Sequence, residues 1–427
     1  MQNKNRLTVA LFAILSLFHF YYGIIPAWTR INSDFPNYYV SSKLLLEGKD
    51  LKNIYDDDWF QQKINEYGIS EPGKYSPFPP PTAFIMIPIA SLPPLAAKRA
   101  YIIINLIALF FIVYLLKKIC GFNFINTCNV VLLSGAALVN NFLFGQFYLI
   151  MLLLILLGYI SLIKNNETSA GIFWGIDAAV KYFTLIYLPI LFFKKSWKTL
   201  ISLVSTVIFI NLAALIFFGM DAYTFFFKNV LLSHFNGELS SQSDYAVQFQ
   251  SWNSFLRNLF VYDAAENTSP LISSLFLFNF SRVIIYLLFS GAAFLVLYRL
   301  KDDRDFIPAA VILLSTLLFV LSPASASYHM LLMILPVILL LKLSRKNIKF
   351  SSAIILLFIL IGFSPFLINK IGSGDLPLFL KYYRLWLEVI LFFISISFLL
   401  KLNRKEDYRL INFRSETPKG IPSVKDL

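Results

Sequence analysis

A single carboxylate stands where the first long apolar run of the chain ends. Asp34 lies in the stretch INSDFPNYY, residues 31–39, and Pro36 follows two residues later. An aspartate here is a typical N-cap for a helix that has a proline in its first turn. A carboxylate at a membrane surface also suits a general base, which accepts the proton of an attacking hydroxyl. The two roles are compatible, because a carboxylate anchored to the backbone is well positioned for catalysis.

Three further ionisable side chains could stabilise a negatively charged substrate. Lys181 lies in the middle of the apolar segment 170–193, and its ammonium either pairs with Asp177, one helical turn earlier, or binds a ligand phosphate. Arg257 follows a polar run, and its guanidinium suits phosphate oxygens. His329 ends the stretch SPASASYH between two apolar runs. This histidine serves either as a hydrogen-bonded packing residue or as a ligand of the substrate.

Amides, hydroxyls and aromatic rings recur beside these ionisable residues, and that mixture suits a carbohydrate. The turn at Gly145-Gln146 either carries an amide that binds sugar hydroxyls or simply joins two helices. The acidic run at 56–58, in contrast, is better explained as a solvated charged face. We therefore predict substrate contacts from Tyr38, Tyr75, Gln146, Gln250, Ser251, Asn253, Ser322 and Ser325.

The elements that must position these residues are membrane-spanning helices. The sequence is 58% hydrophobic and 14% charged, with a mean hydropathy of +0.68. Its apolar segments are about 20 residues long, as a membrane-crossing helix requires, and they do not alternate as barrel strands would. The net charge of +13 does not indicate nucleic acid, because Lys and Arg cluster at loop ends as the positive-inside rule requires. The two cysteines form neither a disulfide framework nor a metal motif.

Alternation of sides predicts about 12 crossing or half-crossing helices, with both termini in the cytoplasm. Segment 170–193 lies between Lys164 and Lys194, so both of its ends belong on one side. We expect it to form two short helices that bend back near Lys181 and line a water-filled cavity. The other predicted spans are 7–28, 98–117, 124–143, 146–163, 198–219, 281–299, 306–322, 328–342, 350–367 and 381–400.

These spans divide the chain into a transmembrane domain, 1–400, and a polar cytoplasmic tail, 401–427. The first external loop, 29–97, contains two amphipathic patterns, near 38–47 and 57–67. They predict interfacial helices, which either hold a lipid-linked head group or serve only for packing. The prolines of YSPFPPP, which begins at Tyr75, predict a stiff extended wall. The second external loop is predicted over 220–280. With this loop included, the polar motifs named above all face one side of the membrane, which indicates a functional site there.

The order of the motifs resembles that of a known family. An acid after the first span precedes Tyr-x-Pro-x-Pro-Pro at 75–80, Gly-Gln at 145–146 and a lysine in a broken helix. Gln-Ser-x-Asn-Ser follows at 250–254, and Ser-Pro-x-Ser-x-x-x-His at 322–329. This order resembles the GT-C glycosyltransferases, specifically glycosyltransferase family 87, which includes polyprenyl-phosphate-mannose-dependent α-1,2-mannosyltransferases. The resemblance covers about residues 30–340.

The resemblance implies an all-α polytopic enzyme of GT-C fold. Such an enzyme transfers a sugar, by family default mannose, from a polyprenyl-phosphate donor to a hydroxyl of a glycolipid or glycan acceptor, with inversion, on the external face. Asp34 matches the family's proposed general base, and His329 matches an active-site histidine. Lys181 matches the family's lysine, although Thr184 stands where a Lys-x-x-Pro motif has its proline. His329 is also single where relatives often carry paired histidines.

The chemistry of such a transfer needs a base and cations that stabilise the departing phosphate. Asp34 is the predicted base, and Lys181, Arg257 and His329 are the predicted cations. No Asp-x-Asp motif follows the first span and no nucleotide-binding loop is present, so we expect no metal, no other cofactor and a lipid-linked donor. The expected partners are the donor, the acceptor and membrane lipids, without nucleic acid. The expected location is a bacterial inner membrane, with the site facing the periplasm or cell exterior.

Two other functions fit a polytopic protein of this kind. A transporter or flippase of lipid-linked glycans would show two related halves and polar groups near mid-membrane. The sequence shows no convincing internal repeat, and its polar groups gather on one face. An O-antigen-type ligase or polymerase would rest on several arginines in large external loops. The loop around 234–258 carries only Arg257.

Overall fold

The protein is built almost entirely of helices. The computed structural model describes residues 2–239, 242–371 and 376–402. Within these ranges, β structure is limited to the isolated bridge between Asp263 and Asn267. Six described helices are long and apolar enough to cross a membrane, or seven if a bent pair counts as one span. These features confirm an all-α polytopic membrane protein, while the number of about 12 crossings stays a prediction.

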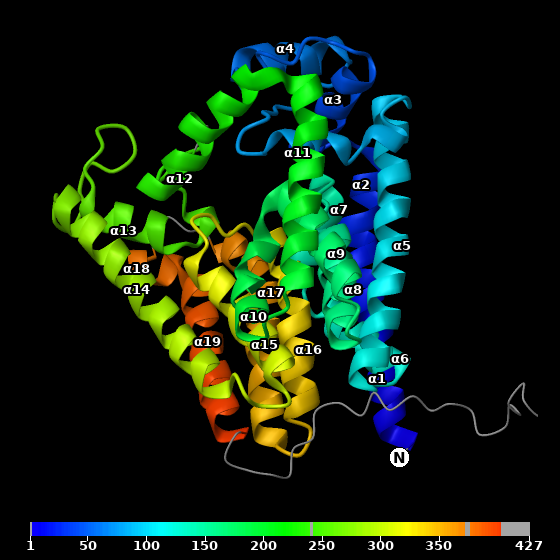
Figure 1. The fold of residues 1–427 in the computed structure, drawn as a ribbon. Coiled ribbons are helices and arrows are strands. Elements are labelled where there is room, and N and C mark those ends of the chain that lie inside the picture. The colour runs from blue at the N-terminus through cyan, green and yellow to red at the C-terminus, as the bar shows by residue number, and fades with distance from the viewer. Residues whose placement is uncertain (1, 240–241, 372–375, 403–427) are drawn as a thin grey trace, which may run out of the picture.

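The N-terminal half begins with a span and a compact loop. The span comprises α1 (Gln2–His19), the π-helical turn η1 (Phe20–Ile24) and α2 (Ile25–Thr29). The loop carries α3 (Phe35–Leu46), α4 (Asp57–Glu66), and the 3₁₀ turns η2 (Pro80–Phe84) and η3 (Ile87–Ile89). Figure 1 shows α3 and α4 at the end of the molecule opposite the N-terminus. The loop therefore covers one end of the helical bundle.

The two predicted loop helices form, but α3 is not the surface helix that its pattern suggested. Ten of its twelve residues are buried. The hydroxyl of Ser42 donates to the carbonyl of Ala83 at 2.6 Å, and the hydroxyl of Tyr39 donates to the carbonyl of Leu92 at 2.7 Å. The polar face of α3 is thus satisfied by the chain that returns beneath it. The predicted extended wall is also shorter than expected, because η2 begins at Pro80.

The span predicted over 124–143 is bent. It consists of α6 (Phe124–Leu132) and α7 (Ala136–Phe144), which meet at 73°. Gly135 lies at the bend with φ +55°, and a Cβ there would be 2.5 Å from the carbonyl oxygen of Gly362. Glycine permits both this positive φ and the close backbone approach. The apolar pattern does not reveal the bend, since both halves remain apolar.

Segment 170–193 breaks where the sequence predicted. Helix α9 (Glu167–Lys181) ends at Tyr182, whose φ is +47°, and η4 (Phe183–Tyr187) and α10 (Leu188–Phe193) follow. The ammonium of Lys194 donates to the carbonyl of Lys301, so the end of α10 lies beside the end of α14. Helix α9 packs between α8 (Tyr148–Ile163) and α11 (Trp197–Phe225). The broken element thus presents Lys181 at its turning point.

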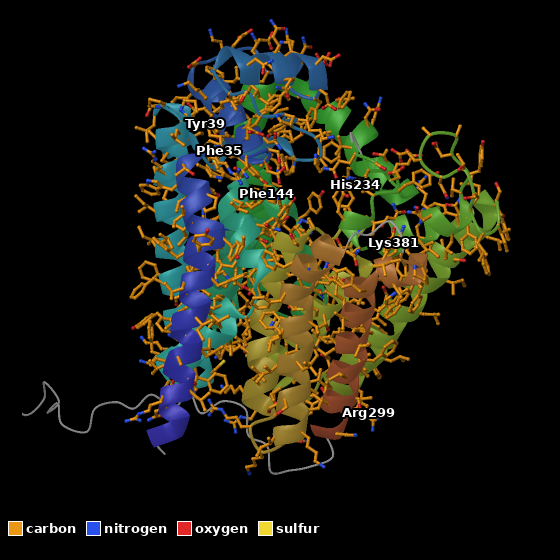
Figure 2. All side chains as sticks on the ribbon, turned by 180° about the vertical axis from the view of Figure 1, so that it is seen from behind. Phe35, Tyr39, Phe144, His234, Arg299 and Lys381 are labelled. Atoms are coloured by element: carbon orange, nitrogen blue, oxygen red, sulfur yellow. The ribbon has the colours of Figure 1, made fainter. Side chains whose placement is uncertain are left out.

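The rest of the chain supplies long helices and short connecting elements. Figure 2 places Arg299, near the end of α14, opposite Phe35 and Tyr39 along the long axis of the molecule. Helix α11 is kinked at Gly219, which has non-helical backbone angles. The elements are α5 (Pro94–Cys120), η5 (Phe226–Leu231), α12 (Leu232–Asn236), η6 (Val247–Phe249), α13 (Trp252–Phe260), α14 (Leu275–Leu300), α15 (Phe306–Leu321), η7 (Ser327–Met333), α16 (Ile334–Leu343), α17 (Ile348–Ile371), α18 (Leu378–Lys381) and α19 (Tyr383–Leu402).

The core follows from this arrangement. A large cluster of buried apolar side chains runs through α5, α7, α8, α15 and α16, while the outer faces of α11 and α14 expose rows of Leu, Ile and Phe. In a membrane protein such outer faces contact lipid. Of the predicted cytoplasmic tail, residues 403–427 lie outside the described residues.

Candidate active site

A cavity of about 560 Å³ lies where the loop between α2 and α5 meets the break after α9 and the turn η7. Its volume falls in the range of roughly 300–1,000 Å³ that is usual for ligand sites. Segments from the beginning, the middle and the C-terminal third of the chain meet in its wall. Side chains in that wall include Asp34, Asn37, Asp57, Lys74, Tyr148, Lys181, Phe183, Ser322, Tyr328 and His329.

Asp34 lies in this wall and does not cap α3. It occupies the N-cap position, but its side chain accepts no hydrogen bond from the helix backbone. Instead, its Oδ2 accepts a hydrogen bond from Nε2 of Gln146 at 2.7 Å, and the hydroxyl of Tyr328 also bonds to the carboxylate. Burial raises the pKa of Asp34 above its ordinary value, and the hydrogen bond from Gln146 and the charge of Lys181 oppose that rise. The geometry therefore favours the general-base interpretation over the cap.

A chain of hydrogen bonds connects the carboxylate to a cation. The ammonium of Lys181 donates to the hydroxyl of Tyr38 at 3.0 Å, and that hydroxyl donates to Oε1 of Gln146 at 2.7 Å. Gln146 then donates to Asp34 from its Nε2. The amide oxygen of Gln146 must accept from Tyr38, and its NH₂ group must donate to the carboxylate of Asp34. These two hydrogen bonds together determine the orientation of the amide. Tyr38 and Gln146 thus connect Lys181 to Asp34.

Lys181 is surrounded by aromatic rings rather than by an acid. Its Nζ lies 4.5 Å from the ring centroid of Tyr148 and 4.8 Å from that of Phe78, and a second hydrogen bond reaches the hydroxyl of Tyr148 at 3.0 Å. Such rings attract a cation through their electron-rich faces. Asp177 is fully buried, does not line the cavity and forms no ion pair with Lys181. Of the two interpretations of this lysine, the geometry favours a ligand contact.

The α7–α8 turn joins two helices, and the side-chain amide of Gln146 bonds Tyr38 and Asp34, so a contact with sugar hydroxyls stays a prediction. Gly145 ends α7 with φ +64°, and a Cβ there would lie 2.9 Å from Nζ of Lys98 and from the ring of Phe35. The turn is tied back by the Gln146 backbone N–H, which donates to the carbonyl of Asn141 at 2.9 Å. Asn141 itself is fully buried. The turn therefore joins two helices and also points the Gln146 amide at Asp34.

His329 lies in η7 against three rings of the cavity wall. Its ring centroid is 4.8 Å from that of Tyr148, 5.1 Å from that of Tyr328 and 5.6 Å from that of Phe183. Ser322 lines the same cavity, whereas Ser325 is fully buried behind it. The ring of His329 is therefore packed and also lines the cavity, and a contact with the substrate stays a prediction.

The wall that contains His329 is fixed by a buried arginine from the C-terminal span. The guanidinium of Arg384 donates to the carbonyls of Ser325 and Gln248, and its side chain pairs with Glu388, with 3.5 Å between Nε and Oε1. Oε1 of Gln250 accepts from the backbone N–H of Arg384 at 3.0 Å. The backbone N–H of Ser325 donates to the carbonyl of Phe249 at 2.7 Å. We call residues 248–250, Ser325, Arg384 and Glu388 the Arg384 joint.

Several predicted substrate-binding residues thus lie outside the cavity wall. Gln250 belongs to the Arg384 joint, and Ser251 caps α13 by accepting from the backbone N–H of Ser254 at 3.2 Å. Tyr75 is fully buried, and its hydroxyl donates to the carbonyls of Pro79 and Pro80. In these positions the side chains hold the wall rather than face the cavity.

Arg257 and Asn253 bind the same backbone carbonyl, outside the cavity wall. The guanidinium of Arg257 donates to the carbonyl of Gly237 at 2.9 Å and pairs with Asp244 at 3.5 Å. Asn253 donates to the carbonyl of Gly237 at 2.7 Å. Neither side chain lines the cavity. The structure therefore brings Asp34, Lys181, His329 and Ser322 together, with Tyr38 and Gln146 behind them, and leaves Arg257 and Asn253 apart.

Other cavity residues were not singled out by the sequence. Asp57 and Asp58 line the cavity, so the acidic run is not merely a solvated face; Asp56, its first member, caps α4 through the backbone N–H of Trp59. Lys74, Tyr148 and Tyr328 also line it. Each of these three stands within two residues of a motif that the sequence did indicate, and this proximity is the signal that could have found them.

The residues that the structure describes contain no group of three or more His, Cys, Asp or Glu side chains suited to a metal ion. The expectation that no metal is needed stays a prediction.

The chain was compared with known proteins. A family model described as glycosyltransferase family 87 matches residues 77–323, more than half of the chain. No curated protein matches it. The matched range contains Gln146, Lys181 and Ser322, and the cavity joins these residues to Asp34 and His329, which lie outside that range. The chain therefore belongs to glycosyltransferase family 87 and is a membrane glycosyltransferase.

Proposed function

We propose that this glycosyltransferase takes its sugar, mannose in the first instance, from a polyprenyl-phosphate donor. The acceptor is a hydroxyl of a glycolipid or glycan on the external face of a bacterial inner membrane. The observation that carries the proposal is the hydrogen-bonded chain from Lys181 to Asp34 in the wall of one cavity. Membership of a glycosyltransferase family argues against the transporter or flippase. The connection of Asp34 to Lys181 argues against it as well, because transport requires no pairing of a base with a cation.

The reaction is a single displacement. The acceptor hydroxyl oxygen forms a bond to the anomeric carbon of the donor sugar as the bond from that carbon to the phosphate oxygen breaks. Asp34 accepts the hydroxyl proton, and polyprenyl phosphate leaves with the bonding electron pair. Attack from the face opposite the leaving group inverts the configuration at the anomeric carbon.

The phosphate of the donor binds at the Lys181 end of the cavity. An ammonium has three N–H donors, and Lys181 uses two of them on Tyr38 and Tyr148. The third is available to a phosphate oxygen, whose charge increases as the bond to the sugar breaks. His329 lies beside the same Tyr148 ring and supplies a second contact. Arg257 has its own acidic partner, so we assign it no phosphate contact.

The sidedness of the proposal follows from the distribution of charge. Lys117 and Arg299 lie in the last turns of α5 and α14, and Lys164 and Lys194 follow α8 and α10. Figure 2 shows Arg299 at the end of the molecule away from Phe35 and Tyr39 of the first external loop. Under the positive-inside rule this end faces the cytoplasm. The cavity then opens on the opposite side, where lipid-linked sugars are used.

The test is a transfer assay with purified protein in nanodiscs. The donor is radiolabelled polyprenyl-phosphate-mannose, and the acceptor is a lipid extract of the native membrane. Wild type is expected to transfer label, and Asp34→Asn, which keeps the shape of the side chain, to lose about 10²–10⁴-fold in rate. Gln62→Glu, an exposed change on α4, is the matched control and should transfer normally.

Thermal unfolding of both variants accompanies the assay. Full activity in a folded Asp34→Asn variant would contradict the assigned base. Absence of transfer by wild type with mannose, glucose, galactose and other lipid-linked sugars alike would contradict the donor class.

A further inference from the structure

The cavity has an outer part that the proposed reaction does not use. The proposed reaction uses Asp34, Lys181 and His329; we use the name outer part for the wall formed by Asn37, Asp57, Gln61, Gly73 and Lys74. All five outer residues come from the first external loop, on α3, on α4 and on the chain between α4 and η2.

Asn37 is a buried amide with a free end in this part of the wall. It is 6% exposed, and its Oδ1 accepts from the backbone N–H of Lys74 at 2.8 Å. Its Nδ2 has no partner among the residues that the structure describes, which leaves two N–H donors. Asn37 also stands three residues after Asp34, so the two side chains leave the same face of the chain about 5–6 Å apart. That separation is short enough for one sugar residue to reach both.

The neighbouring amide is fixed in the same way. Oε1 of Gln61 accepts from the backbone N–H of Gly73 at 2.9 Å, and its Nε2 donates to Asn65 at 3.0 Å. The backbone N–H groups of the consecutive residues Gly73 and Lys74 thus fix the side-chain oxygens of Gln61 and Asn37. A Cβ on Gly73 would lie 2.5 Å from Oδ1 of Asn37, so this wall requires glycine. The amides are held in place before any ligand binds.

The charged members of the outer part are of both signs. Lys74 is half-buried, and its ammonium has no hydrogen-bond or ion-pair partner among the described residues. Burial lowers the pKa of Lys74, and the charges of Asp57 and Asp34 oppose that fall. Oδ1 of Asp57 is buried and has no hydrogen-bond partner within the described chain. An anionic ligand would be repelled by Asp57 and a cationic one by Lys74. A neutral ligand that carries several hydroxyls can donate to the carboxylate and accept from the ammonium and the amide.

We infer that this outer part binds the acceptor through two neutral sugar residues. Asn37 and Lys74 contact the sugar that presents its hydroxyl to Asp34, and Asp57 and Gln61 contact the sugar next to it. The inference rests on the proposed function and deepens it. The acceptor is thereby a glycan or glycolipid that ends in at least two sugars, rather than a single sugar or a charged head group.

Binding is measured without any donor, by calorimetry on the full chain in nanodiscs. The probes are hexyl glycosides with one or two hexose residues, in the manno, gluco and galacto series, and hexyl phosphate. Wild type is expected to bind one disaccharide about tenfold or more tightly than its monosaccharide. Asp57→Asn and Gln61→Glu change the two side chains assigned to the second sugar and should abolish that difference, whereas Asn37→Asp and Lys74→Met should weaken the binding of both probes. Lys52→Met, an exposed lysine of the same loop, should retain the difference.

Gln61→Glu keeps the oxygen that accepts from the backbone N–H of Gly73, so a folded variant is expected even if Asp57→Asn unfolds; thermal unfolding checks both. The inference is overturned if no disaccharide binds more tightly than its monosaccharide, if both variants retain the preference, or if hexyl phosphate binds as tightly as the best disaccharide. A disaccharide preference that needs Asp57, found in a protein that transfers no lipid-linked sugar, would support the glycan site while contradicting the proposed function.

Discussion

Asp34 can accept a proton only while it is ionised, so its surroundings set the acid limit of activity. The charge of Lys181 lowers the pKa of Asp34, while burial raises it. Removing that charge in Lys181→Met therefore raises the pKa of the carboxyl further. The acid limb of the kcat/KM profile should move to higher pH, and kcat should fall by about 10²-fold through loss of the phosphate contact.

The measurement is the pH profile of transfer for wild type, Lys181→Met and Lys164→Met. Lys164 is an exposed lysine and serves as the charge-matched control. A profile for Lys181→Met that keeps the wild-type acid limb would show that the charge of Lys181 does not act on Asp34.

Gly145 allows a second test at the same scale. Alanine there must adopt φ +64° and also meet Lys98 and Phe35, whereas Gly48, with φ +66°, has open space within 4 Å of where a Cβ would lie. We expect Gly145→Ala to destabilise the protein by about 1–3 kcal/mol more than Gly48→Ala. Only Gly145→Ala should lower transfer, because it displaces Gln146. Thermal unfolding and the transfer assay measure the two effects; equal behaviour of the variants would contradict the close packing.

Individual residues were predictable from the sequence when an unusual side chain interrupted an apolar run. Asp34, Lys181 and His329 were found in this way, and all three line the cavity. Arg257 and Asn253 carry equally suitable groups, yet they face a neighbouring loop. Which way such a side chain points depends on where α13 begins and how it is rotated. Local composition does not contain that information.

At the scale of elements, the Arg384 joint connects α19 to the cavity wall. Both members of its ion pair are buried, with side-chain exposures of 3% for Arg384 and 0% for Glu388. Removing one partner of a buried pair leaves an uncompensated charge and costs about 3–5 kcal/mol, whereas removing both costs less. We expect Arg384→Met to lower the unfolding temperature more than the double variant Arg384→Met/Glu388→Met does.

Activity should respond differently, because both variants lose the guanidinium that holds Ser325 and Gln248. Transfer by the double variant should stay as low as that of the single variant although its stability is partly restored. Arg384→Lys should recover part of the rate. Recovery of the full rate in the double variant would show that the joint serves stability alone.

The elements were predictable where a long apolar pattern determines them. The helices near 38–47 and 57–67 and the break near Lys181 lie where the sequence placed them. The bend between α6 and α7 was missed because it depends on contact between Gly135 and Gly362, more than two hundred residues apart. The burial of α3 was missed for the same reason, since the chain that covers it comes from the later part of the loop.

For the whole molecule, the arrangement predicts which surfaces face each side of the membrane. Asn53 is exposed in the first external loop, and Asp302 is exposed in the turn between α14 and α15. A membrane-impermeant maleimide should label Asn53→Cys in intact cells and Asp302→Cys only after permeabilisation. The native Cys120 and Cys128 are buried, so the background is low. The reverse pattern would place the cavity on the cytoplasmic side.

The membrane class, the helical fold and the common location of the main motifs could all be predicted from the sequence. Composition and the length of apolar runs determine the first two, and the positive-inside rule supports the third. The connection of the C-terminal span to the site could not be predicted, because Arg384 reads as an ordinary flanking charge of a membrane helix. Its partners become visible only when α19 packs against α15.

This placement of Arg384 bears on how the enzyme is made. The cavity wall is complete only when residue 384 has met Ser325 and Gln248. During synthesis, all the residues that line the cavity therefore leave the ribosome before Arg384, whose contacts hold the cavity wall. A chain that lacks α19 contains Asp34 and Lys181 without the contacts that hold Ser325 and Gln248, so we expect the cavity wall to be completed only when α19 has packed against the bundle.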